Sequence, residues 1–297
     1  MRTKSMVLAL TACLGMALPA VARIAVVTTT TDLAAIAREV GGDEVTVESI
    51  MTGRDDPHHI QLKPSDMLKV RRAQVLVKVG LALDFWIQPV MEAARNNTML
   101  LVDASQGVSV LQKPTGGLDP TRGDIHPQGN PHYWLDPYNG TIIAHNIALG
   151  LAKIDPPHAP AYFQREKAFD GRLVAALTGW LRESKAWSGT KVITYHASWI
   201  YFMQRFGLDG VATIEDKPGI PPSAAHVATL DTLMTVQRIR MIFQEPYFPV
   251  ALGEQLAARH GAKFIVLAPS VNGQPGTGDY LTLFDHHVRA IKALLGT

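Results

Sequence analysis

The sequence predicts an α/β protein with two lobes, each built on a four-stranded, mostly parallel sheet covered by helices. Eight short runs of apolar and β-branched residues recur along the chain, and each is followed by a turn or helix signal. Strands of this kind, separated by helical segments, are typical of parallel sheets that are buried on both faces. A long helical pattern separates the first four runs from the last four. The length of 297 residues also suggests about two domains, and a hydrophobic content of 47% is enough for a large core.

Each run is read as one strand that ends at a turn. The first four runs are IAVVTTT (24–30), VTVESIM (45–51), VLVKVG (75–80) and MLLVDAS (99–105). The second four are KVITYHA (191–197), DGVATIE (209–215), RMIFQEP (240–246) and KFIVLAP (263–269).

The segment between the two sets predicts one long helix over about 159–187. Its apolar residues follow steps of 7, 4, 4, 3 and 7, which place them on one helix face: Tyr162, Phe169, Leu173, Leu177, Trp180 and Trp187. At 1.5 Å per residue such a helix is about 40 Å long and can run along two lobes, although an ordinary core helix has the same pattern. We therefore divide the chain into an N-terminal lobe (23–157), a connecting helix (158–188) and a C-terminal lobe (189–297).

The first 22 residues have the pattern of a cleaved export signal. Arg2 and Lys4 give a basic start, an apolar run follows, and Ala22 ends a small-residue cleavage site. Cys13, the single cysteine, lies in this segment, so a lipid anchor at Cys13 is the alternative. Without Arg2 and Lys4 the 28 basic residues become 26, against 26 acidic ones. This balance gives no indication of a nucleic-acid partner, and no second apolar run predicts a membrane span.

Three histidines follow predicted strands and are the candidate functional residues. His58 follows the second strand in RDDPHHIQLKPSD, His132 follows the fourth in GNPHYWLDP, and His196 ends the fifth in VITYHASW. Because ligands of open parallel sheets bind beyond the carboxyl ends of the strands, a cleft between the lobes can bring all three together. Three neutral imidazoles suit zinc and similar transition metals.

The remaining histidines are expected to be solvated or hydrogen-bonded, as is common for this residue type. His286 and His287, in the last predicted helix, are expected at the surface. Ser223 is expected to cap the helix that follows it, and nearby Glu215 and Asp216 are read first as structural, or else as groups that hold a ligand in place.

Longer stretches of the sequence resemble the zinc- and manganese-binding family of substrate-binding proteins of ABC transporters. The resemblance is carried by DPHHIQLKPSDMLKVRRAQVLVKVG, NPHYWLDPYN and YHASWIYFMQRFGL, in that order. It implies two α/β lobes joined by a rigid helix, with a single metal ion between them held by His58, His132 and His196. A histidine at the third position is similar to the zinc-binding members. The resemblance further implies a monomeric periplasmic receptor, not an enzyme, that delivers its ion to an ABC permease.

The fourth ligand that the resemblance implies is missing. The family pattern has an aspartate after the last strand, where this chain has Ala268 in VLAPSVNG. Glu245, after the seventh strand, is our first candidate to replace it. His126, Asp279 and a water molecule are the alternatives, with Asp124 a weaker one. The short loop around 115–131 gives little support for a metal-capturing role.

Two other functions remain open from the sequence. The same receptor role with manganese, iron or a metal chelate as cargo is one, although manganese prefers oxygen ligands. The second is a zinc metallohydrolase, because three histidines and a water also form a catalytic zinc site, with Glu245 as a general base.

Overall fold

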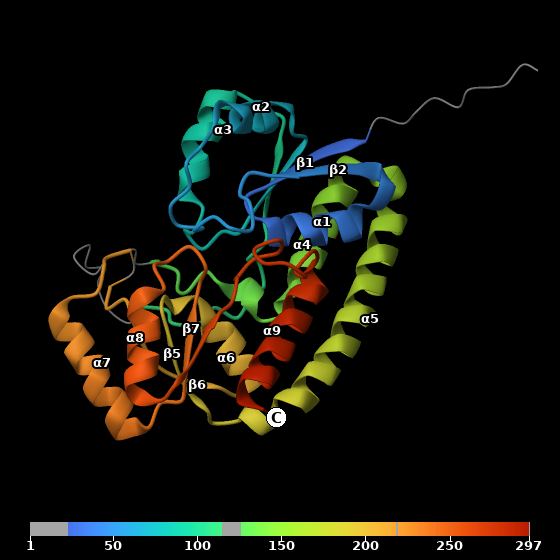
Figure 1. The fold of residues 1–297 in the computed structure, drawn as a ribbon. Helices are drawn as coiled ribbons and strands as arrows, with labels where there is room; N and C mark the ends of the chain where they lie inside the picture. The colour runs from blue at the N-terminus through green and yellow to red at the C-terminus, as the bar shows by residue number, and fades with distance from the viewer. Residues whose placement is uncertain (1–22, 115–125, 218, 297) are drawn as a thin grey trace, which may run out of the picture.

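The computed structural model describes residues 23–114, 126–217 and 219–296 and contains two lobes of similar construction (Figure 1). The predicted export signal, Cys13 and Asp124 lie outside the described residues. No helix within the described ranges has both the length and the apolar character needed to cross a bilayer.

Each lobe is centred on one parallel sheet of four strands. The first sheet has the order β2-β1-β3-β4, and the second has the matching order β6-β5-β7-β8. Every strand pair within them is parallel. The strands are β1 (Ile24–Thr28), β2 (Val45–Ser49), β3 (Val75–Lys78), β4 (Leu100–Asp103), β5 (Lys191–Thr194), β6 (Asp209–Thr213), β7 (Met241–Gln244) and β8 (Lys263–Val266).

All eight predicted strands are confirmed, but each ends two or three residues before its apolar run does. The last residues of a run form the turn into the next helix. Thr30, for example, leaves β1 and caps the following helix by accepting a hydrogen bond from the backbone N–H of Leu33. His196 similarly lies two residues beyond β5, at the start of a short 3-10 turn. The run ends are therefore where the sheet presents its functional side chains.

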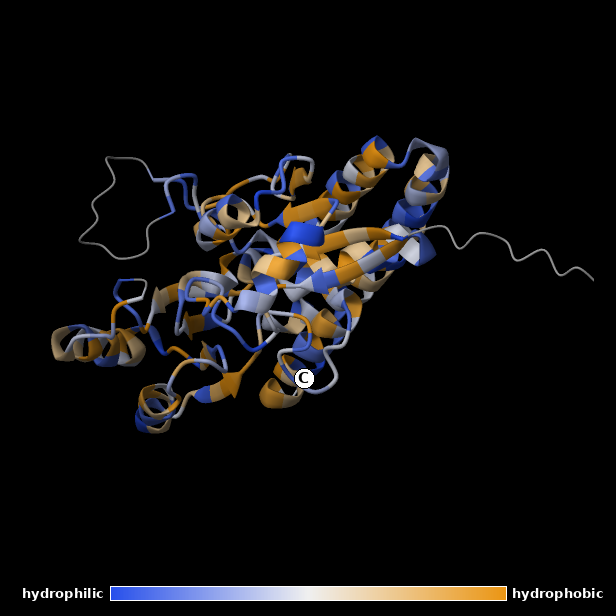
Figure 2. Ribbon diagram, turned by 90° about the horizontal axis from the view of Figure 1, so that it is seen from above, coloured by the Kyte–Doolittle hydropathy of each residue, from blue (hydrophilic) through white to orange (hydrophobic). Residues whose placement is uncertain are grey.

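Helices cover both sheets, whose strands are mainly apolar (Figures 1 and 2). In the N-terminal lobe they are α1 (Thr31–Gly41), α2 (Pro64–Arg72), α3 (Gln88–Ala94) and α4 (Asn139–Ile154). In the C-terminal lobe they are α6 (Ile200–Phe206), α7 (Ala224–Gln237), α8 (Ala251–His260) and α9 (Tyr280–Leu295). Ser223 caps α7 as expected, because its side chain accepts a hydrogen bond from the backbone N–H of His226.

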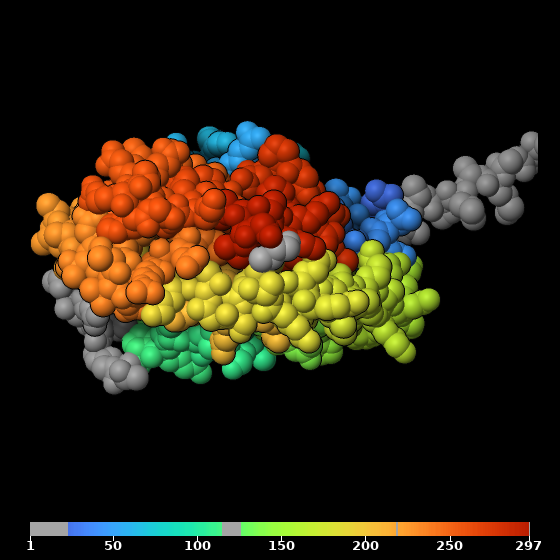
Figure 3. Space-filling view, turned by 60° about the horizontal axis from the view of Figure 1, so that its bottom comes forward, coloured from blue at the N-terminus to red at the C-terminus, as the bar shows by residue number. Residues whose placement is uncertain are grey.

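The connecting helix α5 (Ala159–Ser184) runs along both lobes, and a 3-10 turn extends it to Trp187. Figure 3 shows its yellow to yellow-green atoms as a continuous band beside the red atoms of α9. All six apolar residues predicted for its inner face are buried. Arg165 at one end donates to the carbonyls of Val40 and Gly41 in α1, and Trp180 at the other donates to Asp285 in α9. One continuous hydrophobic core therefore joins the lobes through α5.

The lobes also bond to each other directly near the ends of the strands. The indole of Trp134 donates to the carbonyl of Pro269 at 2.8 Å, and the hydroxyl of Tyr280 donates to the carbonyl of Trp134 at 2.6 Å. In α1, the carboxylate of Asp32 accepts the backbone N–H of Val271 at 2.9 Å. These bonds hold the two sheets in a fixed relation beside the cleft.

The core face of α5 gives a direct test of the shared core. We expect Leu173→Ala to lower the free energy of unfolding by about 3 kcal/mol, because it leaves a cavity in a fully buried position. The neighbouring Val174, which is 45% exposed, is the matched control. Urea unfolding of Leu173→Ala and Val174→Ala measures both, and equal stabilities of the two variants would contradict the packing described here.

Asp32 predicts a pH dependence of stability. Burial raises the pKa of Asp32 from 3.8 to about 7. The neutral acid is therefore favoured in the folded state, and its contribution is present below about pH 4 and lost as the pH rises through 7. The parent chain is expected to lose stability between pH 5 and pH 8. Asp32→Asn cannot ionise, so we expect its free energy of unfolding to fall less over this range, by on the order of 2 kcal/mol.

The control for this measurement is Asp43→Asn, because the side chain of Asp43 is fully exposed. Urea unfolding at both pH values compares the variants with the parent chain. A parent-like pH dependence in Asp32→Asn would show that the interlobe carboxyl does not titrate as described.

Candidate metal site

His58 is positioned by the loop that follows β2. The carboxylate of Asp56 accepts the backbone N–H of His58 at 2.9 Å, which forms a tight turn before the ring. The indole of Trp86 donates to the carbonyl of Pro57 at 3.1 Å and ties the loop to the lobe. The fixed φ of Pro57 further limits the loop. His58 is thus presented by a constrained backbone rather than by a regular element.

His132 is held by Asn130, a residue that the sequence reasoning missed. The amide oxygen of Asn130 accepts both the backbone N–H and the ring Nδ1–H of His132, each at 3.0 Å. Its amide nitrogen donates to the carbonyl of Ala197 in the other lobe at 2.8 Å. Because Nδ1 carries the proton, Nε2 of His132 keeps a free lone pair. An asparagine two residues before a candidate ligand is the signal that could have identified this role.

His196 is oriented by Glu215, which follows β6. The ring Nδ1–H of His196 donates to the Glu215 carboxylate at 2.8 Å, and both side chains are buried. A carboxylate on the far nitrogen fixes the ring and strengthens Nε2 as a metal ligand. From the sequence we considered Glu215 first as a structural residue and second as a group that holds a ligand in place. Its contact with His196 is the one expected for the second role.

The three candidate imidazoles converge between the lobes. One ligand atom from each of His58, His132 and His196 lies within 4.8 Å of the others. The Nε2 atoms of His58 and His132 are 3.1 Å apart, close to the roughly 3.3 Å that a tetrahedral zinc with bonds near 2.0 Å requires. Within the described residues no other group of three histidine, cysteine or acidic side chains meets this spacing.

The surroundings set the protonation of the three rings. Burial, together with the charges of the neighbouring histidines, lowers the pKa of His58 and of His132, so both are neutral and can bind a metal. Burial also acts to lower the pKa of His196, but the hydrogen bond to Glu215 and the charges of Glu245 and Glu215 raise it overall. The two carboxylates thus supply the negative charge on the C-terminal side of the site.

Glu245 lies next to this group but not within it. Glu245 follows β7 and is fully buried. Neither of its carboxyl oxygens forms a hydrogen bond of ordinary geometry with a described residue. Burial raises its pKa to about 7, although the charge of His196 and the Ser198 hydroxyl act in the opposite direction. Its carboxyl oxygens are not among the three converging ligand atoms, so ligation by Glu245 requires its side chain to rotate.

Of the other candidates for the fourth position, His126 adjoins the group, whereas Asp279 and Ala268 contribute no ligand atom to it. The ring centroid of His126 is 5.0 Å from that of His58 and 6.5 Å from that of His132, which places it to one side of the group. The carboxylate of Asp279 instead caps α9 by accepting the backbone N–H of Thr282 at 2.8 Å. Ala268 is buried and brings only a methyl group.

The surface position expected for His287 is wrong. Its ring is fully buried against Trp199, Phe202 and Phe284, and Nε2–H donates to the carbonyl of Ala268 at 2.9 Å. Burial lowers its pKa to about 3, so the ring is neutral. The last helix faces the core at this position, and a His-His pair on a helix does not reveal which of its members faces inward. The hydrogen bonds expected for other histidines are present at His145, His158, His226 and His260.

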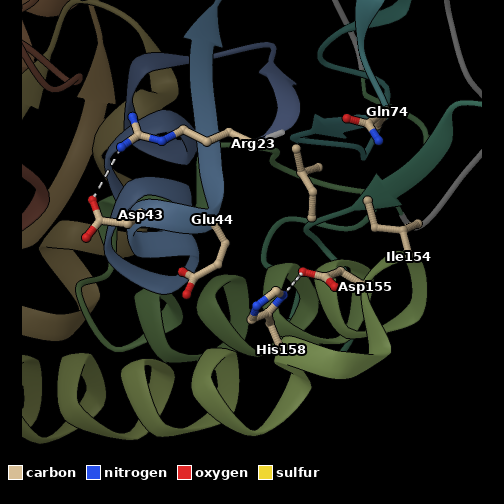
Figure 4. A pocket seen from close by; sticks show the side chains of 8 residues that line it. Arg23, Asp43, Glu44, Gln74, Ile154, Asp155 and His158 are labelled. Atoms are coloured by element: carbon tan, nitrogen blue, oxygen red, sulfur yellow. Dashed lines mark hydrogen bonds and ion pairs between the residues drawn. The ribbon is translucent and has the colours of Figure 1, made fainter. Parts of the chain in front are cut away.

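Two hollows, one between the lobes and one in the N-terminal lobe, differ in their fitness for a ligand. One, of about 280 Å³, is lined by His58 and His196 and adjoins the three imidazoles. The other, of about 410 Å³, lies at the opposite end of the lobe, where Figure 4 shows its charged side chains. There Arg23 pairs with Asp43, and His158 with Asp155. These pairs neutralise each other, and of the two hollows only the first adjoins the candidate metal site.

The fold and this site together define a two-lobed metal-binding protein with a histidine site between its lobes. Comparison of the sequence with family models matches residues 26–294 to the family described as zinc-uptake complex component A, periplasmic. The chain belongs to this family. The family resemblance stated from the sequence motifs is thereby confirmed, as is the two-lobed fold.

Individual relatives differ in the metal that their names specify. The iron-binding protein YfeA of Yersinia pestis is 25% identical over 285 residues, covering 91% of this chain and 86% of that protein. The high-affinity zinc uptake system protein ZnuA of Brucella abortus is 25% identical over 74% of this chain and 76% of its own. A crystal structure of ZnuA superposes with a TM-score of 0.80 at 25% identity, covering 92% of this chain and 99% of that one.

The contact between Glu215 and His196 generates a prediction for metal affinity. We expect Glu215→Gln to weaken Zn²⁺ binding about 10–100-fold, because the ring of His196 loses its charged partner. The neighbouring Asp216, whose side chain is 58% exposed, gives the control variant Asp216→Asn. Competition with a chromophoric zinc chelator measures both affinities. Equal affinities in the two variants would show that Glu215 does not support the ligand.

Proposed function

We propose that this protein is a periplasmic receptor that captures a divalent transition metal, with zinc as its principal cargo, and delivers it to an ABC permease. The observation that carries the proposal is the convergence of His58, His132 and His196 from two lobes on one point. Membership of a zinc-uptake family supports both the cargo and the transporter partner. In this account the receptor acts as a monomer and remains outside the membrane.

Zinc is favoured by the donor set. Neutral imidazoles suit zinc, whereas manganese prefers sites rich in carboxylate and carbonyl oxygen. A relative named for iron makes iron the first competitor to test. The carboxylate of Glu215 balances part of the charge of a divalent ion without adding an oxygen ligand to the converging group.

We further propose Glu245 as the fourth ligand when the ion enters alone. Its buried carboxyl group lies close enough to His196 to affect the charge of that ring, and neither oxygen has a hydrogen bond of ordinary geometry that it must give up. Binding of a metal ion would therefore offset the free-energy cost of burying the carboxylate, which otherwise has no hydrogen bond of ordinary geometry. A water molecule is the alternative donor at this position.

The shared core supports a small closing motion rather than a wide hinge. The interlobe bonds of Trp134 and Asp32 would have to break for the sheets to separate. Release would then depend on the permease loosening the cleft, because a tight site releases its ion slowly. Nearly identical X-ray scattering profiles with and without zinc are expected from such a receptor.

We also propose that the protein does not catalyse hydrolysis. A hydrolase needs a general base that can reach a water on the metal. Of the carboxylates beside the site, Glu215 is bonded to His196, Asp56 accepts the backbone N–H of His58, and Glu245 would itself be a ligand in the proposed site. Zinc-dependent ester or phosphate hydrolysis by the loaded protein, lost in His196→Ala, would contradict this proposal.

Calorimetric titration of the metal-stripped mature chain tests the receptor proposal. We expect one tight Zn²⁺ site, weaker binding of Fe²⁺ and Mn²⁺, and much weaker Zn²⁺ binding in His196→Ala. The control is His145→Ala, because His145 is half-exposed and lies outside the site. Absence of a tight Zn²⁺ site in the parent chain would contradict the proposal.

The same titration decides the role of Glu245. We expect Glu245→Gln, which keeps the volume of the side chain, to weaken Zn²⁺ binding by at least the roughly 10–100-fold that loss of a supporting partner costs. Unchanged affinity in this variant would leave water or His126 as the fourth donor, and His126→Ala would then distinguish the two.

A further inference from the structure

We propose that the 280 Å³ hollow beside His58 and His196 binds a small chelating amino acid together with the metal, so that the site also takes up a metal–amino acid complex. This inference rests on the proposed function, because it requires a metal on the three histidines. It extends that function by naming a second form of cargo and the cavity that would receive it.

The position of the hollow is the first argument. Two of its lining residues, His58 and His196, are candidate metal ligands. A molecule in the hollow therefore lies against the metal site. Since Ala268 brings no donor and Glu245 lies outside the converging group, the metal keeps at least one position for a donor from outside the chain. Zinc can also accept five ligands, so ligation by Glu245 does not exclude this donor.

Part of the wall of the hollow is stiff and apolar. The rings of Tyr195 and Phe248 are stacked with centroids 4.3 Å apart and 21° between their planes, and both residues line the hollow. Pro221 and Pro249 also line it. Stiff walls reduce the ordering cost of binding, and their flat apolar surfaces suit a planar side chain.

Polar groups line the hollow from both lobes: Asp56 on the DPHH loop, and His196 and Glu215 on the opposite side. Asp56 lines the hollow, and its carboxylate already accepts the backbone N–H of His58 and contacts the ring of His59. A carboxylate has about four acceptor positions, so Asp56 can also accept an N–H group of a ligand. This pattern fits a molecule with metal donors at one end, a flat apolar part, and an N–H group.

The volume limits the class of ligand. Pockets for drug-sized molecules start at about 300 Å³, so this hollow admits only a smaller molecule. L-histidine combines an amine, a carboxylate and an imidazole within such a size, and two of these groups can bind one metal ion. We therefore choose L-histidine as the probe and L-alanine, which lacks the ring donor, as the comparison.

Equilibrium dialysis of the stripped chain with radiolabelled L-histidine tests the inference. We expect one histidine retained per protein in the presence of one equivalent of Zn²⁺, at least tenfold less without Zn²⁺, and at least tenfold less L-alanine retained under the same conditions. Equal retention of alanine would overturn the assigned ligand class. Loss of Zn²⁺ to the free histidine would overturn the inference itself.

A pair of substitutions locates the bound amino acid. Pro249→Trp places a large ring at the wall of the hollow and is expected to abolish retention of histidine. Val250→Trp changes the next residue, which does not line the hollow, and is expected to retain it. Retention by Pro249→Trp would overturn the location.

The Zn²⁺ content measured in the same dialysis separates two failures. Zn²⁺ bound without histidine contradicts only this inference. Absence of bound Zn²⁺ in a parallel dialysis without histidine contradicts the receptor function on which the inference rests.

Discussion

The three imidazoles come from two separate sheets, so the site depends on the fixed relation between the lobes. The inner face of α5 and the bonds of Trp134 and Asp32 maintain this relation. In both sheets the loops that follow the carboxyl ends of the strands carry the candidate ligands, and these ligands converge on one point between the lobes. No helix or strand therefore has to span the cleft to form a metal site between the lobes. The metal site requires only that the two lobes keep their relative positions.

Each imidazole is then oriented by a local partner of a different kind. His58 depends on a proline-containing turn, His132 on the amide of Asn130, and His196 on the carboxylate of Glu215. Asn130 also donates a hydrogen bond to the carbonyl of Ala197 in the other lobe. The same side chain therefore orients the ring of His132 and links the two lobes. The rings of His58 and His132 stay neutral, while carboxylates on the C-terminal side provide the compensating charge. This combination favours a divalent ion with an affinity for nitrogen.

The sequence predicted the parts of this arrangement that follow from periodicity. Apolar runs gave eight strands, and one apolar stripe gave the connecting helix, because burial requires those patterns. The contacts of Asn130 were missed, since a hydrogen bond between loop residues leaves no periodic trace. The buried position of His287 was missed for a related reason: its ring fills the core opposite Ala268, and only packing reveals that it faces inward. The limits assigned to the lobes and the identity of the metal ligands stay predictions.

The central claim is that three histidines from two lobes hold one metal ion. X-ray absorption spectroscopy of the zinc-loaded protein tests it most directly, because the method counts imidazole ligands on the metal. The account predicts three imidazole nitrogens at about 2.0 Å, with oxygen as the remaining donor when no chelator is present. His196→Ala would reduce the imidazole count to two. A zinc ion surrounded mainly by oxygen, or an imidazole count unchanged by His196→Ala, would contradict the account.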